Sequence, residues 1–238
     1  KIQQFLTPLP RNMLGIADPD HARLKTLVQA GFTPKRMDQL VGRTEDIAER
    51  LIQNLKSQSR FDLIQAFALP LPATVISELL GVPEADRAKF AHWSQVLLSA
   101  PAGSGRIVLS LPGMINFVRY LRKLIAMKRA KPADDLVSAL VAIEAEGDRL
   151  SGDELQAMIA ILLSAGHEMT TNLIGNGTLA LLKDPRARER LATEPDIASR
   201  AVEELLRYDG PVEATTLRYA RTDIVLAGTS IARGDIVL

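Results

Sequence analysis

The residues best suited to chemistry lie in one run, ILLSAGHEMTTNLIGNG, at positions 161–177. Gly166 removes the side chain from one helical turn, so a flat ligand or another backbone could approach closely. Glu168 is an acid among apolar neighbours, where ionisation is costly without water or a donor. Thr170 and Thr171 can bond back to carbonyls one turn earlier and bend the helix. This set suits a proton relay beside a bound ligand; the alternative is a structural kink with a water-satisfied glutamate.

Three other places carry charged residues that could serve a site. His21 and Lys25 are spaced i, i+4, so both could donate to an anion from one helix face; a solvated face is the alternative. Glu204 and Arg207 are spaced i, i+3, a pattern that surface ion pairs also show. Arg218 is a single cation in an alternating strand pattern, and its context allows either solvent or an anionic ligand group.

The run at 161–177 belongs to an unusually long predicted helix. Ser151 and Glu154 form a capping box, and helical character continues to Lys183, before Asp184 and Pro185. That is roughly 33 residues, or about 50 Å, against an average of about 11 or 12 residues. Because heptads are lacking, we expect the central strut of a large helical fold rather than a coiled coil.

The flanking sequence predicts a mainly α protein with a small β region. Thr33 caps a helix with Pro34 at its first position. Proline and glycine residues mark the ends of the other predicted helices and strands. We expect helices at 21–30, 34–55, 73–80, 111–129 and 134–146, and a further helix that begins at Pro83. The segment 61–67 is ambiguous, Pro70 and Pro72 break the chain, and 99–105 is a loop. Strands are expected at 215–219, 224–226, 230–231 and 236–238. Residues 1–210 are predicted mostly helical and 211–238 mostly strand, in one partial domain.

Composition excludes several classes of function. With 29 basic and 28 acidic residues, the net charge of +1 gives no reason to expect nucleic acid or an anionic membrane as partner. Apolar runs fall far short of the roughly 20 residues that span a membrane, and the first residues lack a signal-peptide pattern, so a cytoplasmic location is expected. The 238 residues contain no cysteine, which excludes disulfides and Cys-ligated metals in this chain.

The order of the motifs is more specific than any one of them. DPDHARLKTLVQAGFTPKRM comes first, AGHEMTTNLIGNG follows at the centre of the long helix, and EELLRYDGPV and TTLRYARTDIVLAGTSIARGDIVL come last. This order resembles the soluble bacterial members of the cytochrome P450 family of haem-thiolate monooxygenases. The resemblance implies a P450-like helical fold, incomplete at both ends, from an internal fragment of a longer protein.

The resemblance also assigns residues to the cofactor. It implies that Ala165 and Gly166 lie against the porphyrin and that His21 and Arg218 pair with the haem propionates. Lys25 stands where the family usually has arginine; it keeps the charge but loses the bidentate fork.

Other residues receive catalytic, structural or substrate roles from the same resemblance. Glu168 would belong to the proton-delivery path, and Glu204 with Arg207 would be the buried ExxR pair. The substrate pocket would be lined by the loop at 100–103 and by four residues after the proline, namely Val212, Ala214, Thr215 and Thr216.

The chain departs from the family pattern at two points. The family's iron ligand is a cysteine, and this chain has none, so it supplies no metal ligand. The family's proton-donating threonine after the acid is replaced by Met169, a weak acceptor without a donor. Thr170 points about 100° further around the helix and is an imperfect substitute.

The resemblance therefore implies a monooxygenase that inserts one atom of O₂ into an apolar small molecule. Haem b is expected in the full-length protein, with electrons from a separate ferredoxin- or flavodoxin-type donor. The alternative is a non-catalytic P450-like scaffold that binds a ligand or a partner, which the absent cysteine and Met169 favour.

Overall fold

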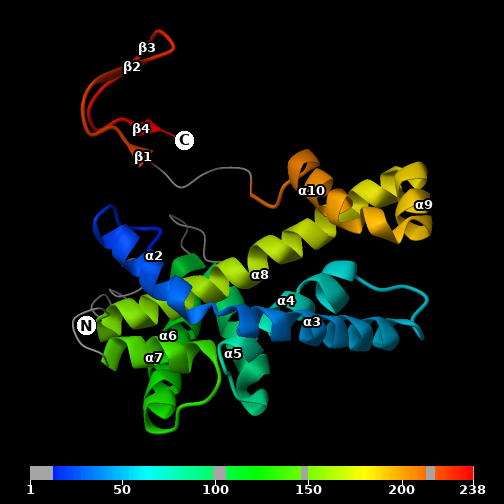
Figure 1. The fold of residues 1–238 in the computed structure, drawn as a ribbon, viewed down its shortest axis with the longest axis horizontal. Helices are drawn as coiled ribbons and strands as arrows, with labels where there is room; N and C mark the ends of the chain where they lie inside the picture. Colours follow the sequence, from blue (N-terminus) through cyan, green and yellow to red (C-terminus); the bar gives the residue numbers. More distant parts are fainter. Residues whose placement is uncertain (1–12, 99–105, 146–149, 213–217, 238) are drawn as a thin grey trace. The chain divides into compact units, whose positions relative to one another are not determined.

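A computed structural model of the chain describes residues 13–98, 106–145, 150–212 and 218–237 (Figure 1). They belong to two compact units, Lys1–Gly175 and Asn176–Leu238. Helices dominate the described residues and strands are few, which confirms the predicted mainly α class with a small β region. The prediction of one domain for the whole chain stays a prediction.

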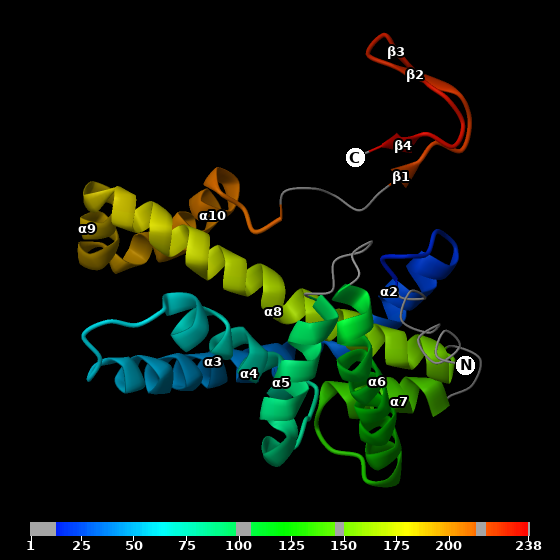
Figure 2. The same ribbon diagram turned by 180° about the vertical axis from the view of Figure 1, so that it is seen from behind.

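The first unit is helical, and Figure 2 shows it from behind. α5 packs on α6, α6 and α2 pack on α7, and α3 packs on α4. In chain order its elements are α2 (Asp20–Gly31), α3 (Pro34–Leu55), the π-helix η1 (Ile64–Ala68), α4 (Pro70–Leu79), α5 (Glu84–Leu98), α6 (Arg106–Ala130), α7 (Leu136–Ala145) and the part of α8 (Gly152–Lys183) that ends at Gly175.

The long helix begins where the capping box predicted. The backbone N–H of Glu154 donates to Ser151 Oγ at 3.2 Å, and Glu154 Oε2 accepts from the Ser151 N–H at 2.8 Å. Two backbone donors that the first turn leaves without helical partners are thereby satisfied. α8 then runs for 32 residues, Gly152–Lys183, which confirms the predicted strut.

Side-chain caps also set the start of two other helices. Thr33 Oγ1 accepts from the Arg36 N–H at 3.3 Å, and Pro34 occupies the first position of α3, as predicted. α7 begins at Leu136 rather than at 134, because Asp135 stands outside the helix as its cap and accepts from the Ser138 N–H at 2.8 Å.

The two prolines at 70 and 72 do not end the helical path, contrary to prediction. α4 begins at Pro70, because the first turn of a helix needs no N–H donors. The ambiguous segment before it forms the π-helix Ile64–Ala68, whose wider turn carries the chain into α4. α6 likewise begins earlier than the predicted residue 111 and continues through Pro112, since its long packed face outweighs one lost hydrogen bond.

The core of the first unit is built from the apolar faces of these helices. Phe90 on α5 packs against the rings of Phe117 and Tyr120 on α6, and Trp93 also contacts Tyr120. Burial of these side chains and of their aliphatic neighbours is the main source of stability. The fully buried aliphatic members include Leu24, Leu80, Leu121, Leu124, Leu136, Leu140, Leu155, Met158, Ile159 and Leu163.

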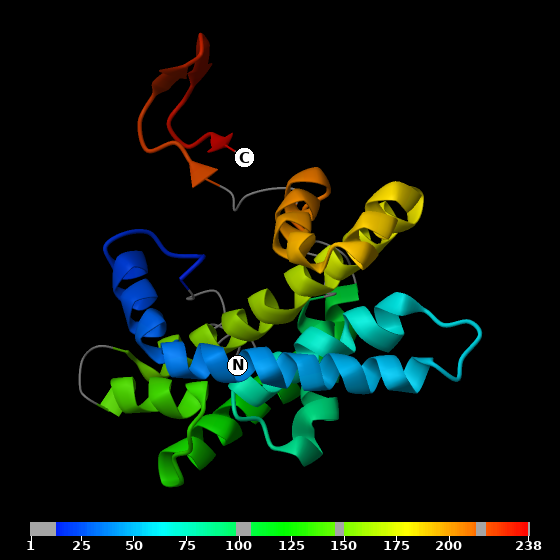
Figure 3. The same ribbon diagram turned by 45° about the vertical axis from the view of Figure 1, so that its right-hand side comes forward.

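The second unit begins in the last turns of α8 and continues with α9 (Pro185–Thr193), the 3₁₀ helix η2 (Pro195–Ile197) and α10 (Ala198–Tyr208) (Figure 3). Asp184 caps α9 by accepting from the Arg186 N–H at 3.0 Å. α10 lies against the end of α8, where a Cβ on Gly177 would be 3.1 Å from Leu205.

Two small antiparallel ribbons make up the β region. β2 (Ile224–Leu226) pairs with β3 (Thr229–Ile231) across a turn at Ala227 and Gly228. β1 (Arg218–Tyr219) pairs with β4 (Ile236–Val237). The predicted strands at 224–226 and 230–231, and residues 236–237 of the strand predicted at 236–238, are confirmed within about one residue, while residue 238 lies outside the described residues. Of the predicted strand at 215–219, residues 215–217 lie outside the described residues.

Candidate functional site

The central segment of α8 presents two different faces. His167 and Thr171, one turn apart, are buried at 2% and 8% exposure. Glu168, Met169 and Thr170 are exposed, Met169 by 42%. Glu168 therefore lies on the open side of the helix in this chain, as the alternative of a water-satisfied glutamate requires, and its place in a proton-delivery path stays a prediction.

Gly166 lies at a close crossing of α8 and α4. A Cβ at this position would come within 2.9 Å of both Cδ1 and Cγ1 of Ile76. Real side chains do not approach this closely without displacement, so the helices keep this separation only with glycine here. The prediction of a close approach at Gly166 is confirmed for a neighbouring helix, while its approach to a porphyrin stays a prediction.

A cavity of about 420 Å³ opens beside this crossing. Three of the predicted site residues, Ala165, Gly166 and Thr170, line it together, and its wall is largely apolar. The volume falls in the range of about 300–1,000 Å³ that small-molecule pockets occupy. The other lining residues are Phe32, Thr44, Leu71, Pro72, Val75, Ile76, Leu79 and Leu162.

Two buried polar groups on α8 bond to carbonyl oxygens. His167 Nδ1 lies 2.9 Å from the Leu163 carbonyl, which is consistent with an Nδ1–H donor. The Thr171 hydroxyl lies 2.7 Å from the carbonyl of His167 and 3.1 Å from that of Ala68, at the end of the π-helix. The sequence showed that Thr171 could bond back along α8, but it did not predict the bond to Ala68.

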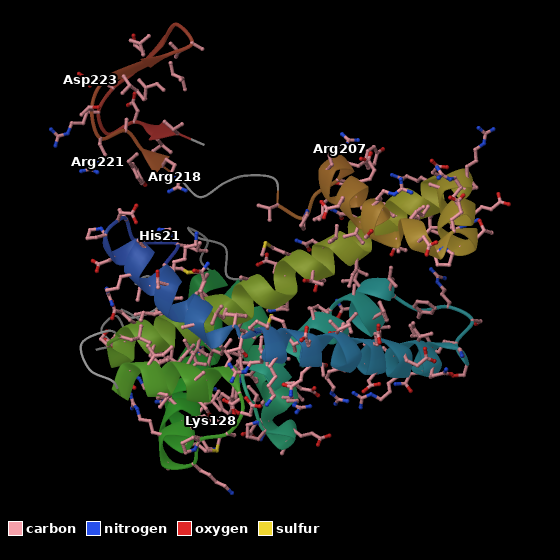
Figure 4. All side chains as sticks on the ribbon, viewed as in Figure 1. His21, Lys128, Arg207, Arg218, Arg221 and Asp223 are labelled. Carbon is pink, nitrogen blue, oxygen red and sulfur yellow. The ribbon has the colours of Figure 1, made fainter. Side chains whose placement is uncertain are left out.

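The predicted anion-binding residues of α2 lie at its surface. His21 is half-buried, with Nδ1 3.4 Å from Asp18 Oδ1, and Lys25 is exposed (Figure 4). The expected i, i+4 spacing on one helix is thus realised. Arg218, in β1 of the second unit, is exposed. The binding of propionates by these three residues stays a prediction.

Glu204 and Arg207 form the expected ion pair on α10 (Figure 4). Arg207 donates from Nε to Glu204 Oε2 at 2.8 Å and from Nη2 to Oε1 at 2.5 Å. The hydrogen bond from Arg207 lowers the pKa of the Glu204 carboxyl. The side chains are 59% and 70% exposed, so in this chain the pair is not buried as the resemblance implied. The cause is that α10 buries none of its residues.

The remaining predicted residues contribute little to the described site. Val212 is 56% exposed. Ala214, Thr215, Thr216 and the loop at 100–103 lie outside the described residues. Among the described residues, no group of three or more His, Asp or Glu side chains is placed to hold a metal ion. In the same part of the chain, no helix is both long enough and apolar enough to cross a membrane.

The fold is mainly helical, and in its first unit an apolar cavity opens beside the central residues of α8. The family model described as "Cytochrome P450" matches residues 114–238. The chain belongs to the cytochrome P450 family, which confirms the resemblance.

Known relatives agree along nearly the whole chain. It is 42% identical over 226 residues to the polyketide biosynthesis cytochrome P450 PksS of Bacillus subtilis, covering 95% of this chain and 55% of the relative. It is 44% identical over 234 residues to the vitamin D(3) 25-hydroxylase of Pseudonocardia autotrophica, covering 98% and 57%. The crystal structure of the myxobacterial CYP267B1 in complex with myristic acid matches with a TM-score of 0.89 and 41% identity, over 97% of this chain and 57% of that one. The chain thus spans little more than half the length of these relatives.

Proposed function

We propose that this chain is part of a P450 monooxygenase that inserts one oxygen atom from O₂ into an apolar small molecule. The observation that carries the proposal is the cavity at the centre of α8, where Ala165, Gly166 and Thr170 meet on one apolar wall. Relatives support the substrate class, because their names refer to polyketide biosynthesis, to vitamin D(3) and to a complex with myristic acid. All of these point to predominantly apolar molecules.

The residues present fit one face of a haem. The macrocycle is flat and apolar, and Ala165 and Gly166 add little side chain of their own to an apolar wall on which Ile76 also lies. His21 and Lys25 of α2 carry charges suited to its propionates, and the resemblance adds Arg218 of the second unit. When bound, a thiolate-ligated haem supplies the electron density that favours cleavage of the O–O bond. Since these 238 residues hold no cysteine, the proposal places the thiolate outside them.

The chain's own residues then divide the work of positioning and proton transfer. Ala165 and Gly166 keep the wall free of side chains. Glu168, exposed on the same helix, exchanges protons with water, and Thr170 holds a hydroxyl at the lining of the cavity. The Thr170 hydroxyl lies 3.5 Å from the Gly166 carbonyl, so it is only weakly engaged and remains free to rotate. Met169 can neither donate nor relay a proton.

Electrons would come from a separate ferredoxin- or flavodoxin-type protein. The family needs two electrons for each oxygen atom inserted, and this chain, without cysteine, cannot hold a Cys-ligated iron–sulphur cluster. Reconstitution of the full-length protein with a ferredoxin and, separately, with a flavodoxin tests this part of the proposal.

The proposal is tested on the full-length protein by haem titration, followed by the absorption spectrum of the reduced, carbon monoxide-bound form. We expect stoichiometric haem and the long-wavelength Soret band of a thiolate complex, shifted by myristic acid in the oxidised form. Gly166→Val, which adds a side chain to the wall and crowds Ile76, should lower the amount of haem taken up by the protein that remains folded. Gly42→Val is the matched control, because nothing lies within 4 Å of a Cβ at that position of α3. A folded full-length protein that takes up no haem would instead support the non-catalytic scaffold.

A further inference from the structure

The carbonyl of Ala68 lacks the donor that a helix would normally give it. Four residues on stands Pro72, in the first turn of α4, and proline has no N–H. Ala68 is fully buried, so water cannot easily replace the missing donor. A buried carbonyl without a partner is destabilising, because it has lost its hydrogen bond to water and gained none in the protein. The structure resolves this with a side chain from α8, the hydroxyl of Thr171, at 3.1 Å.

Thr171 also bonds to the His167 carbonyl at 2.7 Å, so its single proton is shared between two acceptors. The His167 carbonyl already lies in the helical ladder of α8, where the backbone N–H of residue 171 is its regular donor. The bond to Ala68 is the one that joins two helical segments 103 residues apart in sequence. Thr171 itself is 8% exposed, so competition from water is small.

Three close contacts hold this part of α8 against the segment from η1 to α4. Gly166 approaches Ile76, Gly175 approaches Ile64, and Thr171 donates to Ala68. The two glycine contacts are steric and tolerate small rotations of the helix, whereas the Thr171 hydrogen bond is directional and is lost when the helix turns. Glu168, Met169 and Thr170 lie between Gly166 and Thr171.

We propose that Thr171 is a positioning residue: by donating to the carbonyl that Pro72 leaves unpaired, it fixes the rotation of residues 168–170 beside the cavity. The proposal rests on the proposed function for the roles of those three residues. The coupling between Thr171 and Pro72 stands independently of it, because it is a property of the two helices alone.

The test is a double-mutant cycle in the full-length protein, with Thr171→Val and Pro72→Ala made singly and together. Valine keeps the shape of threonine but removes the donor, and alanine at 72 restores a backbone N–H for the Ala68 carbonyl. Amide hydrogen exchange over residues 166–171 is the readout that needs no haem. We expect Thr171→Val to speed exchange there by roughly ten- to a hundredfold, since an unpaired buried carbonyl costs about 1–3 kcal/mol. In the Pro72→Ala background the same change should have an effect of about threefold or less, because the helix then supplies its own bond.

Thr171→Ser is the matched control. It keeps the hydroxyl and loses only a methyl group, so its effect should be the same with Pro72 and with Ala at 72. If Thr171→Val speeds exchange equally in both backgrounds, or leaves exchange at 166–171 unchanged, the inference is wrong.

A second readout separates positioning from a purely structural role. In the haem-loaded protein, far below its unfolding temperature, Thr171→Val should alter the Soret shift that myristic acid induces, and adding Pro72→Ala should restore it. A purely structural role would lower the unfolding temperature and leave that shift unchanged. If the full-length protein binds no haem, the proposed function fails while the exchange cycle still decides whether Thr171 and Pro72 are coupled, so the two failures are distinguishable.

Discussion

Lys128 and Asp135 form a buried ion pair between the end of α6 and the start of α7, with Nζ 2.5 Å from Oδ2. Both residues are less than one-tenth exposed. Gly81, at the end of α4, lies directly against the pair, and a Cβ there would be 2.3 Å from Asp135 Oδ2 and 2.6 Å from Lys128 Nζ. Three helix ends therefore meet at one buried pair of charges.

Removal of one charge from this pair should destabilise the protein strongly. Asp135→Asn and Lys128→Met each leave an uncompensated buried charge, for which we expect a loss of about 3–5 kcal/mol in the free energy of unfolding. Urea denaturation measures it. Arg190→Met, at the exposed pair with Glu194, is the control and should change the free energy of unfolding little, because water screens the pair. An equally small loss for Lys128→Met would show that the pair is solvated rather than buried.

The crossing at Gly166 predicts opposite effects for the same substitution at two helical glycines. Gly42→Ala, in α3 with open space around it, should stabilise the protein by about 0.5–1 kcal/mol through helix propensity. Gly166→Ala gains the same propensity but meets Ile76 at 2.9 Å, and overpacking costs about 1–3 kcal/mol, so the net effect should be destabilising.

The unfolding temperatures of Gly42→Ala and Gly166→Ala, compared with that of the wild-type protein, test this prediction. Ile76→Val, which removes the Cδ1 atom, should recover part of the loss in the Gly166→Ala background. If Gly166→Ala were stabilising, the crossing would be looser than the structure shows.

Glu78 predicts a dependence of stability on pH. Its carboxylate accepts from Arg43 Nε at 2.6 Å and from Arg87 Nη1 at 2.6 Å, which ties α4 to α3 and α5. The hydrogen bond from Arg43 is the largest of the effects that lower the pKa of Glu78. An unfolded glutamate takes up its proton near pH 4.3, and folded Glu78 takes it up at a lower pH because the two arginines stabilise its charged form. The stability that this site contributes is therefore complete above the unfolded pKa and is lost as the pH falls through the folded pKa.

Glu78→Gln removes the titrating group and should flatten this part of the pH profile. Near pH 7 the variant should be less stable than the wild-type protein, and the difference should shrink at acid pH. Urea midpoints measured from neutral to acid pH test it. A difference that stays constant across the series would contradict the role of the carboxylate charge.

The sequence predicted those parts of the fold whose causes are local. Ser151 and Glu154 are three residues apart, so the capping box and the start of α8 follow from spacing alone. The pair of Glu204 with Arg207 was predictable for the same reason. The approach of Gly166 to Ile76 was not, because the sequence shows that a glycine permits closeness but not which residue approaches it.

The buried polar contacts were missed for a different reason. Nothing in the sequence marks Lys128 and Asp135 as a buried pair, since charged residues are rarely buried. A signal for Thr171 did exist: a proline four residues after a buried alanine leaves a carbonyl that needs a side-chain donor. Only the tertiary structure shows which of the many hydroxyls of the chain supplies it.

The ExxR pair allows a comparison between this chain and the longer protein. Glu204 and Arg207 are exposed here, so Glu204→Gln should leave the unfolding temperature of the 238-residue chain nearly unchanged. If the pair is buried in the full-length protein, as family membership implies, the same substitution should reduce folded, haem-containing protein severely. Thermal unfolding of the chain and haem content of the full-length variant test the two parts. A large loss in the short chain would show that the pair already carries structure there.

Met169 predicts how efficiently the full-length protein uses oxygen. It is 42% exposed on α8, between Glu168 and Thr170, where the family has a proton-donating threonine. Under the proposed function, a thioether there leaves the Thr170 hydroxyl, 3.5 Å from the Gly166 carbonyl, or water to bring protons to the cavity. Met169→Thr restores a donor without crowding, since the position faces open space. We expect the ratio of oxygenated product to hydrogen peroxide to rise by roughly tenfold, the low end of the effect of one placed proton donor.

Thr170→Val should lower the same ratio in the wild-type background and have less effect once Thr replaces Met169. Product and peroxide are measured per electron consumed, with myristic acid as the probe. If neither substitution changes the ratio, proton delivery takes a route that uses neither residue.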